Sequence, residues 1–242
     1  MSPRWLALLF AGCFILVVIA RMPVAAVLHM TDISAGGLSF SRASGTIWNG
    51  QIHGLAWRGN DLGSVRIAAQ PLALLLGRVG AKITLNADGP ASGSASVALS
   101  LTGLHLRDVK ITADVARLPV LLPLSGKIQL DLVRADLGGR GCRNAEGNVR
   151  TDALVDRPAG LAWKGPELVG RISCLNGGIF IPMSGRDGDN LVGIATTLNR
   201  DGGFSVNIEA RTPDAAVLSV LSAVGFVETG GMMVLSQSGR WI

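Results

Sequence analysis

The stretch SASVALSLTG, residues 94–103, decides the fold of this chain because its side chains alternate strictly between two kinds. One set of alternate positions is apolar and the other carries hydroxyl groups: Val97, Leu99 and Leu101 against Ser96, Ser100 and Thr102. Successive residues of a β-strand point to opposite faces of a sheet, so this segment can bury one face and expose the other. Such alternation is typical of an antiparallel sheet with one solvated face.

The same period of two recurs along the chain on both sides of this stretch. It is found in four further apolar sets: Ile83, Leu85 and Ala87; Val109, Ile111 and Ala113; Ile128, Leu130 and Leu132; and Phe204, Val206 and Ile208. Residues 44–59, SGTIWNGQIHGLAWRG, indicate a strand pair punctuated by glycine. The sequence therefore predicts a mainly β fold built of antiparallel, curved sheet.

Only a few short helices are expected. Residues 71–76 fit a compact helical turn that begins with proline and is closed by Gly77. The apolar segment 117–124, RLPVLLPL, is expected to pack across the sheet, and its two prolines leave its conformation open. Residues 213–224 are predicted to form a helix that is capped by Thr212 and ended by Gly225.

Two segments in different parts of the chain match closely. Residues 54–63 read GLAWRGNDLG and residues 160–170 read GLAWKGPELVG, so that Trp57 and Trp163 are equivalent. The match predicts an internal duplication, in which each half is a small curved sheet with one short helix. The predicted halves span about residues 44–135 and 145–242. Both tryptophans are expected to be core anchors.

A long apolar run precedes the strands. Residues 5–20, WLALLFAGCFILVVIA, carry no charge and lie between Arg4 and Arg21. As a helix this run rises about 24 Å, against roughly 30 Å of bilayer hydrocarbon, and the flanking arginines and Trp5 suit the interfaces. The expected order is a cytoplasmic stub, a transmembrane anchor with its juxtamembrane segment, and an exported β-rich domain: residues 1–4, 5–28 and 29–242.

A cleaved signal peptide is the alternative for the same segment. Its basic start, its apolar run and Val24-Ala25-Ala26 loosely fit the pattern for cleavage after small residues. Against this, the run is long for a signal, and Arg21 interrupts the approach to the cut. A buried core helix is disfavoured because the run has no polar face at helical spacing. Both membrane-directed interpretations place the rest of the chain across the membrane.

The charge of the chain does not indicate a nucleic-acid partner. The net charge is +5 and the isoelectric point is 9.7, but the basic residues are dispersed. The densest cluster, Arg134, Arg140 and Arg143, contains Asp136 and lies next to Glu146, whereas nucleic-acid binding needs basic residues gathered on one face. Asp131 and Asp136, a pair of carboxylates, are expected to be solvated on a wet strand face and its turn. A mildly basic body beside an anionic membrane accounts for the charge.

The cysteines predict one disulfide. Cys13 lies in the apolar run, whereas Cys142 and Cys174 lie in the exported part, where an oxidising compartment favours pairing. Closing this loop of about 33 residues would stabilise the fold by roughly 3–4 kcal/mol. Two unpaired buried thiols and a metal site are the alternatives, and the metal site lacks a CxxC motif or a nearby histidine.

No motif for catalysis or cofactor binding stands out. The three histidines, His29, His53 and His105, are far apart in the sequence and are expected to be structural or at the surface. Residues 187–190, DGDN, resemble part of a calcium loop but lack its later glutamate, and they are ordinary for a tight turn. The chain is therefore expected to have no catalytic, cofactor or metal site, with an enzyme of dispersed residues as a distant alternative.

A succession of motifs follows one order along nearly the whole chain. After the apolar run come the segment GTIWNGQ at residues 45–51, then Pro71 with Leu74, Leu75 and Gly77, then glycine-rich alternating strands and a closing Gly239-Arg240-Trp241. The first motif contains Gly45, Trp48 and Gly50. This succession resembles the type II secretion system protein N family.

The resemblance implies an accessory subunit of the machine that exports folded proteins across the outer membrane of Gram-negative bacteria. It implies a single-pass inner-membrane protein with a cytoplasmic N-terminus, a periplasmic β-rich domain and no catalytic residues. We expect a non-catalytic interaction module that docks other secretion subunits through an exposed sheet edge. The alternative is a membrane-anchored periplasmic carrier whose sheets bury their apolar faces around a lipid chain.

Overall fold

The computed structural model describes residues 21–26, 37–71, 77–117, 125–155 and 163–240, together with Phe10, Phe14 and Val18. Most of the predicted anchor, over residues 5–28, lies outside these residues, as do most of the short apolar segments 71–76 and 117–124. In the part of the chain that is described, no helix is both long enough and apolar enough to span a bilayer.

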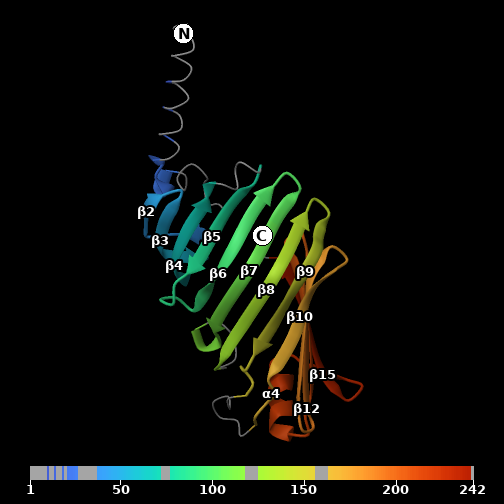
Figure 1. Ribbon diagram of the computed structural model, residues 1–242. Helices are drawn as coiled ribbons and strands as arrows, with labels where there is room; N and C mark the ends of the chain where they lie inside the picture. The colour runs from blue at the N-terminus through green and yellow to red at the C-terminus, as the bar shows by residue number, and fades with distance from the viewer. Residues whose placement is uncertain are drawn as a thin grey trace.

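The strands form one continuous antiparallel sheet (Figure 1). Their bounds are β1 (Leu38–Ser39), β2 (Arg42–Thr46), β3 (Asn49–Trp57), β4 (Asn60–Gln70), β5 (Val79–Leu85), β6 (Ala91–Ser100), β7 (Gly103–Asp114), β8 (Lys127–Gly138), β9 (Gly141–Thr151), β10 (Leu168–Leu175), β11 (Gly178–Asp187), β12 (Asn190–Leu198), β13 (Gly203–Arg211), β14 (Val227–Thr229) and β15 (Met232–Arg240). The spatial order follows the sequence from β3 to β13 and then continues with β15 and β14, while β1 and β2 share one edge of β3. The prediction of a mainly β, antiparallel fold is confirmed.

Neighbouring strands pair so that their apolar positions lie in common rows. Leu99 of β6 lies opposite Val79 of β5 on one side and opposite Leu104 of β7 on the other. Val97 of β6 likewise lies opposite Leu106 of β7. Because the ladders from β3 to β13 continue this arrangement, one face of the sheet is mainly apolar and the other is mainly polar.

Two register shifts keep the apolar positions on that face and bend the sheet. The β6–β7 ladder shifts between Leu106 and Val109, where Asp108 has a φ of 49°. The β8–β9 ladder shifts at Val133, whose side chain is 52% exposed. An extra residue in one strand bends that strand and increases its twist. Leu106 and Val109 are three residues apart, an odd number that would place them on opposite faces of a regular strand. The extra residue of the bulge keeps both on the apolar face.

The curved sheet brings apolar residues of separate strands together. One buried cluster joins β7, β8 and β10 through Val109, Leu132, Ala135 and Ile172. A second cluster joins β10, β12, β13 and β15 and is covered by helix α4 (Ala215–Ala223): Leu168, Val192, Ala210 and Met233. The core is thin, because Leu168 is the only large side chain less than 2% exposed among the described residues.

Helix α4 is the predicted C-terminal helix, with a correction at its start. Asp214 is the N-cap: its Oδ1 accepts hydrogen bonds from the backbone nitrogens of Ala216 and Val217 at 2.9 and 3.2 Å. The predicted cap, Thr212, instead accepts a hydrogen bond from the backbone nitrogen of Asp214. A carboxylate is favoured at this position because it also faces the positive end of the helix dipole.

The two matching tryptophan segments take different conformations. Residues 54–63 form the end of β3, a turn and the start of β4, whereas residues 163–167 carry no strand and lead into β10. The prediction that these segments are equivalent elements is wrong. Asn60 begins β4, but its counterpart is Pro166, which has no backbone N–H for a ladder. The division of the sheet into two similar halves stays a prediction.

A disulfide joins Cys142 of β9 to Cys174 of β10, with a Cα–Cα distance of 5.6 Å. It lies beyond Ile172 and Gly147, the last paired residues of the two strands. Close by, the backbone nitrogen of Cys142 donates to the carbonyl of Gly177 at 2.7 Å. The predicted bond is thus present and fastens the two strands where their ladder ends.

Replacing both cysteines, Cys142→Ala with Cys174→Ala, should lower the free energy of unfolding by about 3–4 kcal/mol. The reason is that the bond closes a loop with a sequence separation of 32, which restricts the unfolded chain. Urea unfolding followed by circular dichroism measures the loss, and the reduced wild-type protein is the matched control. An unchanged midpoint in both samples would contradict this account.

Candidate functional site

Within the described residues, no group of three or more His, Cys, Asp or Glu side chains is arranged to hold a metal ion. The DGDN segment, residues 187–190, forms the turn between β11 and β12. The polar side chains instead form hydrogen-bond networks between neighbouring strands.

The GTIWNG motif forms the β2–β3 hairpin. Gly45 of β2 pairs with Gly50 of β3 across the turn. Gly45 has a φ of +84°, and a Cβ there would lie 2.3 Å from the carbonyl oxygen of Asn49, so this position requires glycine. A Cβ on Gly50 would lie 3.1 Å from Cβ of Val24, which packs directly on the hairpin.

The hairpin also binds the backbone of the segment before it. The backbone nitrogen of Ile47 donates to the carbonyl of Met22 at 3.1 Å, and Pro23 forms a β-bridge with Thr46. Val24 is only 6% exposed. We call residues 22–24 and this hairpin the N-terminal clamp. The clamp fixes the chain to the sheet immediately after the apolar run of the N-terminus.

The tryptophans singled out in the sequence differ in burial. Trp48 lies half-buried in the β2–β3 turn. Trp57 is 38% exposed, with the Arg58 guanidinium 5.3 Å from its ring centre, so the expectation of a core anchor is wrong at this position. Trp57 ends β3 beside the two-residue strand β1, which is too short to cover the ring. Trp163 is half-buried, and its Nε1 is buried without a hydrogen-bond partner among the described residues.

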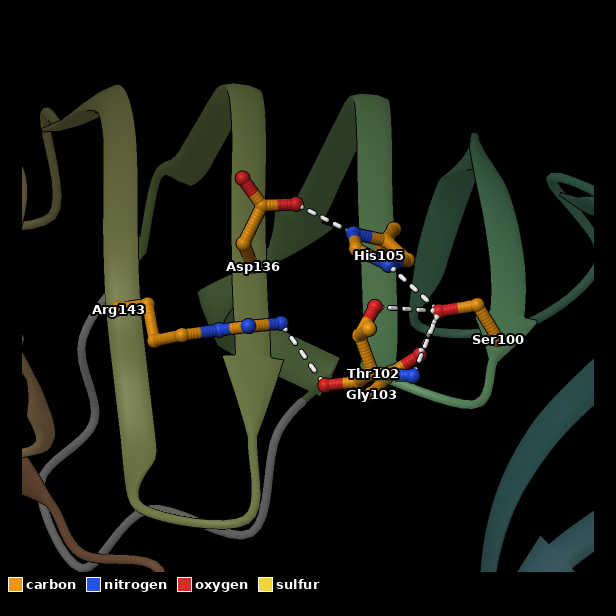
Figure 2. A network of polar contacts seen from close by, with 6 residues as sticks. All are labelled: Ser100, Thr102, Gly103, His105, Asp136 and Arg143. Atoms are coloured by element: carbon orange, nitrogen blue, oxygen red, sulfur yellow. Dashed lines mark hydrogen bonds and ion pairs between the residues drawn. The ribbon is translucent and has the colours of Figure 1, made fainter.

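A polar network ties β6, β7 and β8 together on the polar face (Figure 2). Nδ1 of His105 lies 2.6 Å from Oδ1 of Asp136, and Nε2 lies 3.0 Å from Oγ of Ser100. His105 and Asp136 are directly opposite each other in the ladder, and their side chains are 19% and 24% exposed. We call Ser100, His105 and Asp136 the polar latch.

The latch also holds the turn between β6 and β7. Oγ of Ser100 accepts a hydrogen bond from the backbone nitrogen of Thr102 at 3.2 Å and lies 3.2 Å from the carbonyl oxygen of Gly103. From β9, Nη2 of Arg143 donates to the carbonyl oxygen of Thr102 at 2.9 Å (Figure 2). The turn is therefore held both by its own strand pair and by a strand further along the sheet.

The order of serine, histidine and carboxylate matches that of a hydrolase triad, but the surroundings differ. A nucleophilic serine needs N–H donors directed at the oxyanion, whereas the amide of Thr102 donates to Ser100 itself. The arrangement supports a structural role. The sequence predicted a structural or surface role for His105 but did not predict its partner. Asp136 lies on the polar face as expected, but it is 24% exposed and bound to His105 rather than fully solvated. Thirty-one residues separate the two side chains, and only strand register reveals their contact.

Hydrogen bonding from His105 lowers the pKa of Asp136 below its ordinary value of 3.8, and the charges of Arg107 and Arg143 act in the same direction. A second network joins β4 to the β5–β6 turn, where Ser64 donates to Asp88 from its backbone nitrogen at 3.1 Å and from its hydroxyl at 2.5 Å. These hydrogen bonds lower the pKa of Asp88 in turn. Both carboxylates are thus favoured in their charged forms.

One edge of the sheet is incompletely covered. β14 pairs with β15 only at residues 232–234, whereas β13 pairs with the other side of β15 over residues 233–240. From residue 235 to residue 240 the outer side of β15 has no strand partner within the described part of the chain. We call residues 235–240 the open edge, and residues 236–240 are exposed.

The latch makes a pH-dependent prediction. Asp136→Asn should lower the free energy of unfolding at pH 7 by about 1 kcal/mol, because a neutral hydrogen bond replaces a charge-assisted one. Since folding lowers the pKa of Asp136, the carboxylate stabilises the fold above its ordinary pKa of 3.8, and this contribution is lost as the pH falls through the lower folded value. Urea unfolding at stepped pH measures the difference, with exposed Asp131→Asn as the control. A difference that persists in strong acid would contradict the assignment.

Comparison with known proteins places the chain in a family. The family model described as Type II secretion system (T2SS), protein N matches residues 36–236, which include every strand from β1 to β14. Type II secretion system protein N of Vibrio cholerae serotype O1 is 26% identical over 182 residues, covering 72% of this chain and 67% of that protein. No solved structure matches the chain. The chain belongs to the type II secretion system protein N family.

Proposed function

We propose that this chain is an accessory inner-membrane subunit of the type II secretion system whose non-catalytic periplasmic sheet docks other subunits. Membership of the protein N family supports the assignment to this secretion machine. The observation that carries the docking role is the open edge of β15, where backbone hydrogen-bonding groups are accessible along residues 235–240.

The N-terminal clamp supports attachment to the membrane. Only Arg21 lies between the apolar run, residues 5–20, and Met22, whose carbonyl is bound by the hairpin. A connection this short would hold the sheet close to the inner membrane rather than on a long linker.

The chemistry of the open edge fits the addition of a strand from a partner. Natural sheets block free edges with charged side chains or proline. Here residues 236–238 are Ser, Gln and Ser, and Arg240 lies within 3.7 Å of Asp201 in an ion pair. The edge is therefore polar enough to be soluble and unobstructed enough to accept an extended peptide.

A photo-crosslinking amino acid at Ser238 should capture another secretion subunit in cells that assemble the system. The same amino acid at Gln129, exposed on the central strand β8, is the matched control and should capture none. Mass spectrometry identifies the adducts, and only an identified secretion component counts. Capture at neither position, or equally at both, would refute docking at the open edge.

A second candidate function follows from the thin core. The apolar face packs under α4 at β10, β12, β13 and β15, while apolar residues of β4 to β7 stay half-buried: Ile67, Ile83, Val97 and Leu106. A curved apolar face of this kind can hold an acyl chain. The candidate is a membrane-anchored periplasmic lipid carrier.

Crosslinking at two adjacent residues distinguishes a lipid carrier from a protein whose apolar face is filled by its own side chains. A photo-crosslinking amino acid at Val97 points to the apolar face, and at Ser96 it points to the polar face. A carrier should yield a lipid adduct at Val97 and none at Ser96, as read by the mass of the intact protein. Absence of lipid at Val97 would exclude the carrier and leave docking as the proposed function.

A further inference from the structure

Three large apolar side chains are exposed together at one end of the sheet. Val79 and Leu99 form a cross-strand pair and are 58% and 57% exposed. Leu101 begins the β6–β7 turn and is 104% exposed, so the described part of the chain does not shield it. We call Val79, Leu99 and Leu101 the apolar tip.

The backbone that carries the tip is held in place. Ser100, between Leu99 and Leu101, belongs to the polar latch, and Arg143 binds the carbonyl of Thr102 on the other side (Figure 2). Keeping an apolar side chain in water is unfavourable. A turn that is fixed so as to expose Leu101 therefore indicates an apolar partner outside the chain.

The tip lies at the end of the sheet where the N-terminal segment joins (Figure 1). Pro23 bridges Thr46 next to the β2–β3 turn. Strand direction alternates from β3 to β6, so this turn and the β6–β7 turn lie at the same end. A membrane entered by the N-terminal apolar run would face the tip.

Charge distinguishes the two ends of the sheet. The described connections at the tip end contain Arg78, Arg140 and Arg200 and one carboxylate, Asp201, which pairs with Arg240 at 3.7 Å. The described connections at the opposite end carry five carboxylates, Asp88, Asp152, Glu167, Asp189 and Asp214, and three cations, Arg58, Arg117 and Lys164. An anionic surface is therefore attracted more to the tip end than to the other end.

We propose that the apolar tip inserts into the surface of an anionic lipid bilayer, an inference that rests on the membrane attachment proposed above. Leucine and valine side chains suit the boundary between headgroups and acyl chains, and the neighbouring arginines reach lipid phosphates. The sheet then meets the membrane at two places, the N-terminal clamp and the tip. With two contacts, the tilt of the sheet relative to the membrane is fixed, and so is the direction of the open edge. The N-terminal attachment alone would leave this tilt free.

Fluorescent labels at the two ends of the full chain test this contact. In a Cys13→Ala background, Leu101→Cys carries an environment-sensitive dye at the tip, and Asp189→Cys carries it in the exposed β11–β12 turn of the opposite end. The remaining two cysteines are joined to each other and do not react. In vesicles of phosphatidylethanolamine and phosphatidylglycerol, the dye at 101 should shift to the blue and lose intensity when the acyl chains are brominated. The dye at 189 should do neither.

Flotation of the vesicles separates this proposal from membrane attachment itself. A chain that floats but shows no quenching at position 101 overturns the tip contact and leaves attachment intact, whereas a chain that does not float overturns attachment. Val79→Asp alters an exposed residue, so the fold should persist, and it should abolish quenching at 101 without affecting flotation. A dye that is unquenched in vesicles but shielded in cells by a secretion protein would overturn the lipid contact in favour of a protein partner.

Discussion

The structure depends on the alignment of apolar side chains in rows across neighbouring strands. Leu99 lies opposite Val79 on one side and Leu104 on the other, and a slip of one residue would exchange the apolar and polar faces of the strand. The bulges at Asp108 and Val133 preserve the alignment where successive apolar residues are separated by an odd number of positions. They also bend the sheet, so that residues of β7, β8 and β10 share one buried cluster.

Small residues make this close approach of backbones possible. A Cβ on Gly170 would lie 1.8 Å from the carbonyl oxygen of Pro182, and a Cβ on Gly147 would lie 2.6 Å from that of Asp131. Glycine weakens a strand by its entropy, but here it lets adjacent strands curve tightly. Ala135, fully buried, leaves room beside Leu132 in the first cluster. The abundance of glycine in the sequence is thus a requirement of curvature as well as of turns.

The pattern of residues 94–103 was sufficient to predict the antiparallel sheet, because side-chain alternation is a local property of a strand. The Cys142–Cys174 bond was also predictable from the oxidising compartment that the sequence led us to expect. The polar latch was not, since contact between His105 and Asp136 depends on the register of two strands. The likeness around Trp57 and Trp163 misled because residues 163–167 form no strand, and Pro166, which has no backbone N–H for a ladder, stands where Asn60 begins β4.

Four constraints on the sheet lie at the end where the N-terminal segment joins. The clamp lies at the β2–β3 turn, the latch at the β6–β7 turn, and the disulfide beside the β8–β9 and β10–β11 turns. Arg200 of the β12–β13 connection donates to the carbonyl of Gly139, which links two further turns at this end. The opposite end carries three long connections, residues 115–126, 152–167 and 212–226. It is tied by the hydrogen bonds of Asp88 with Ser64 and of Asp152 with the backbone nitrogen of Lys127. A hydrogen-bonded sheet that is stiffened at one end transmits the orientation of that end along its strands. The position of the open edge is therefore set by whatever holds the clamp and the tip.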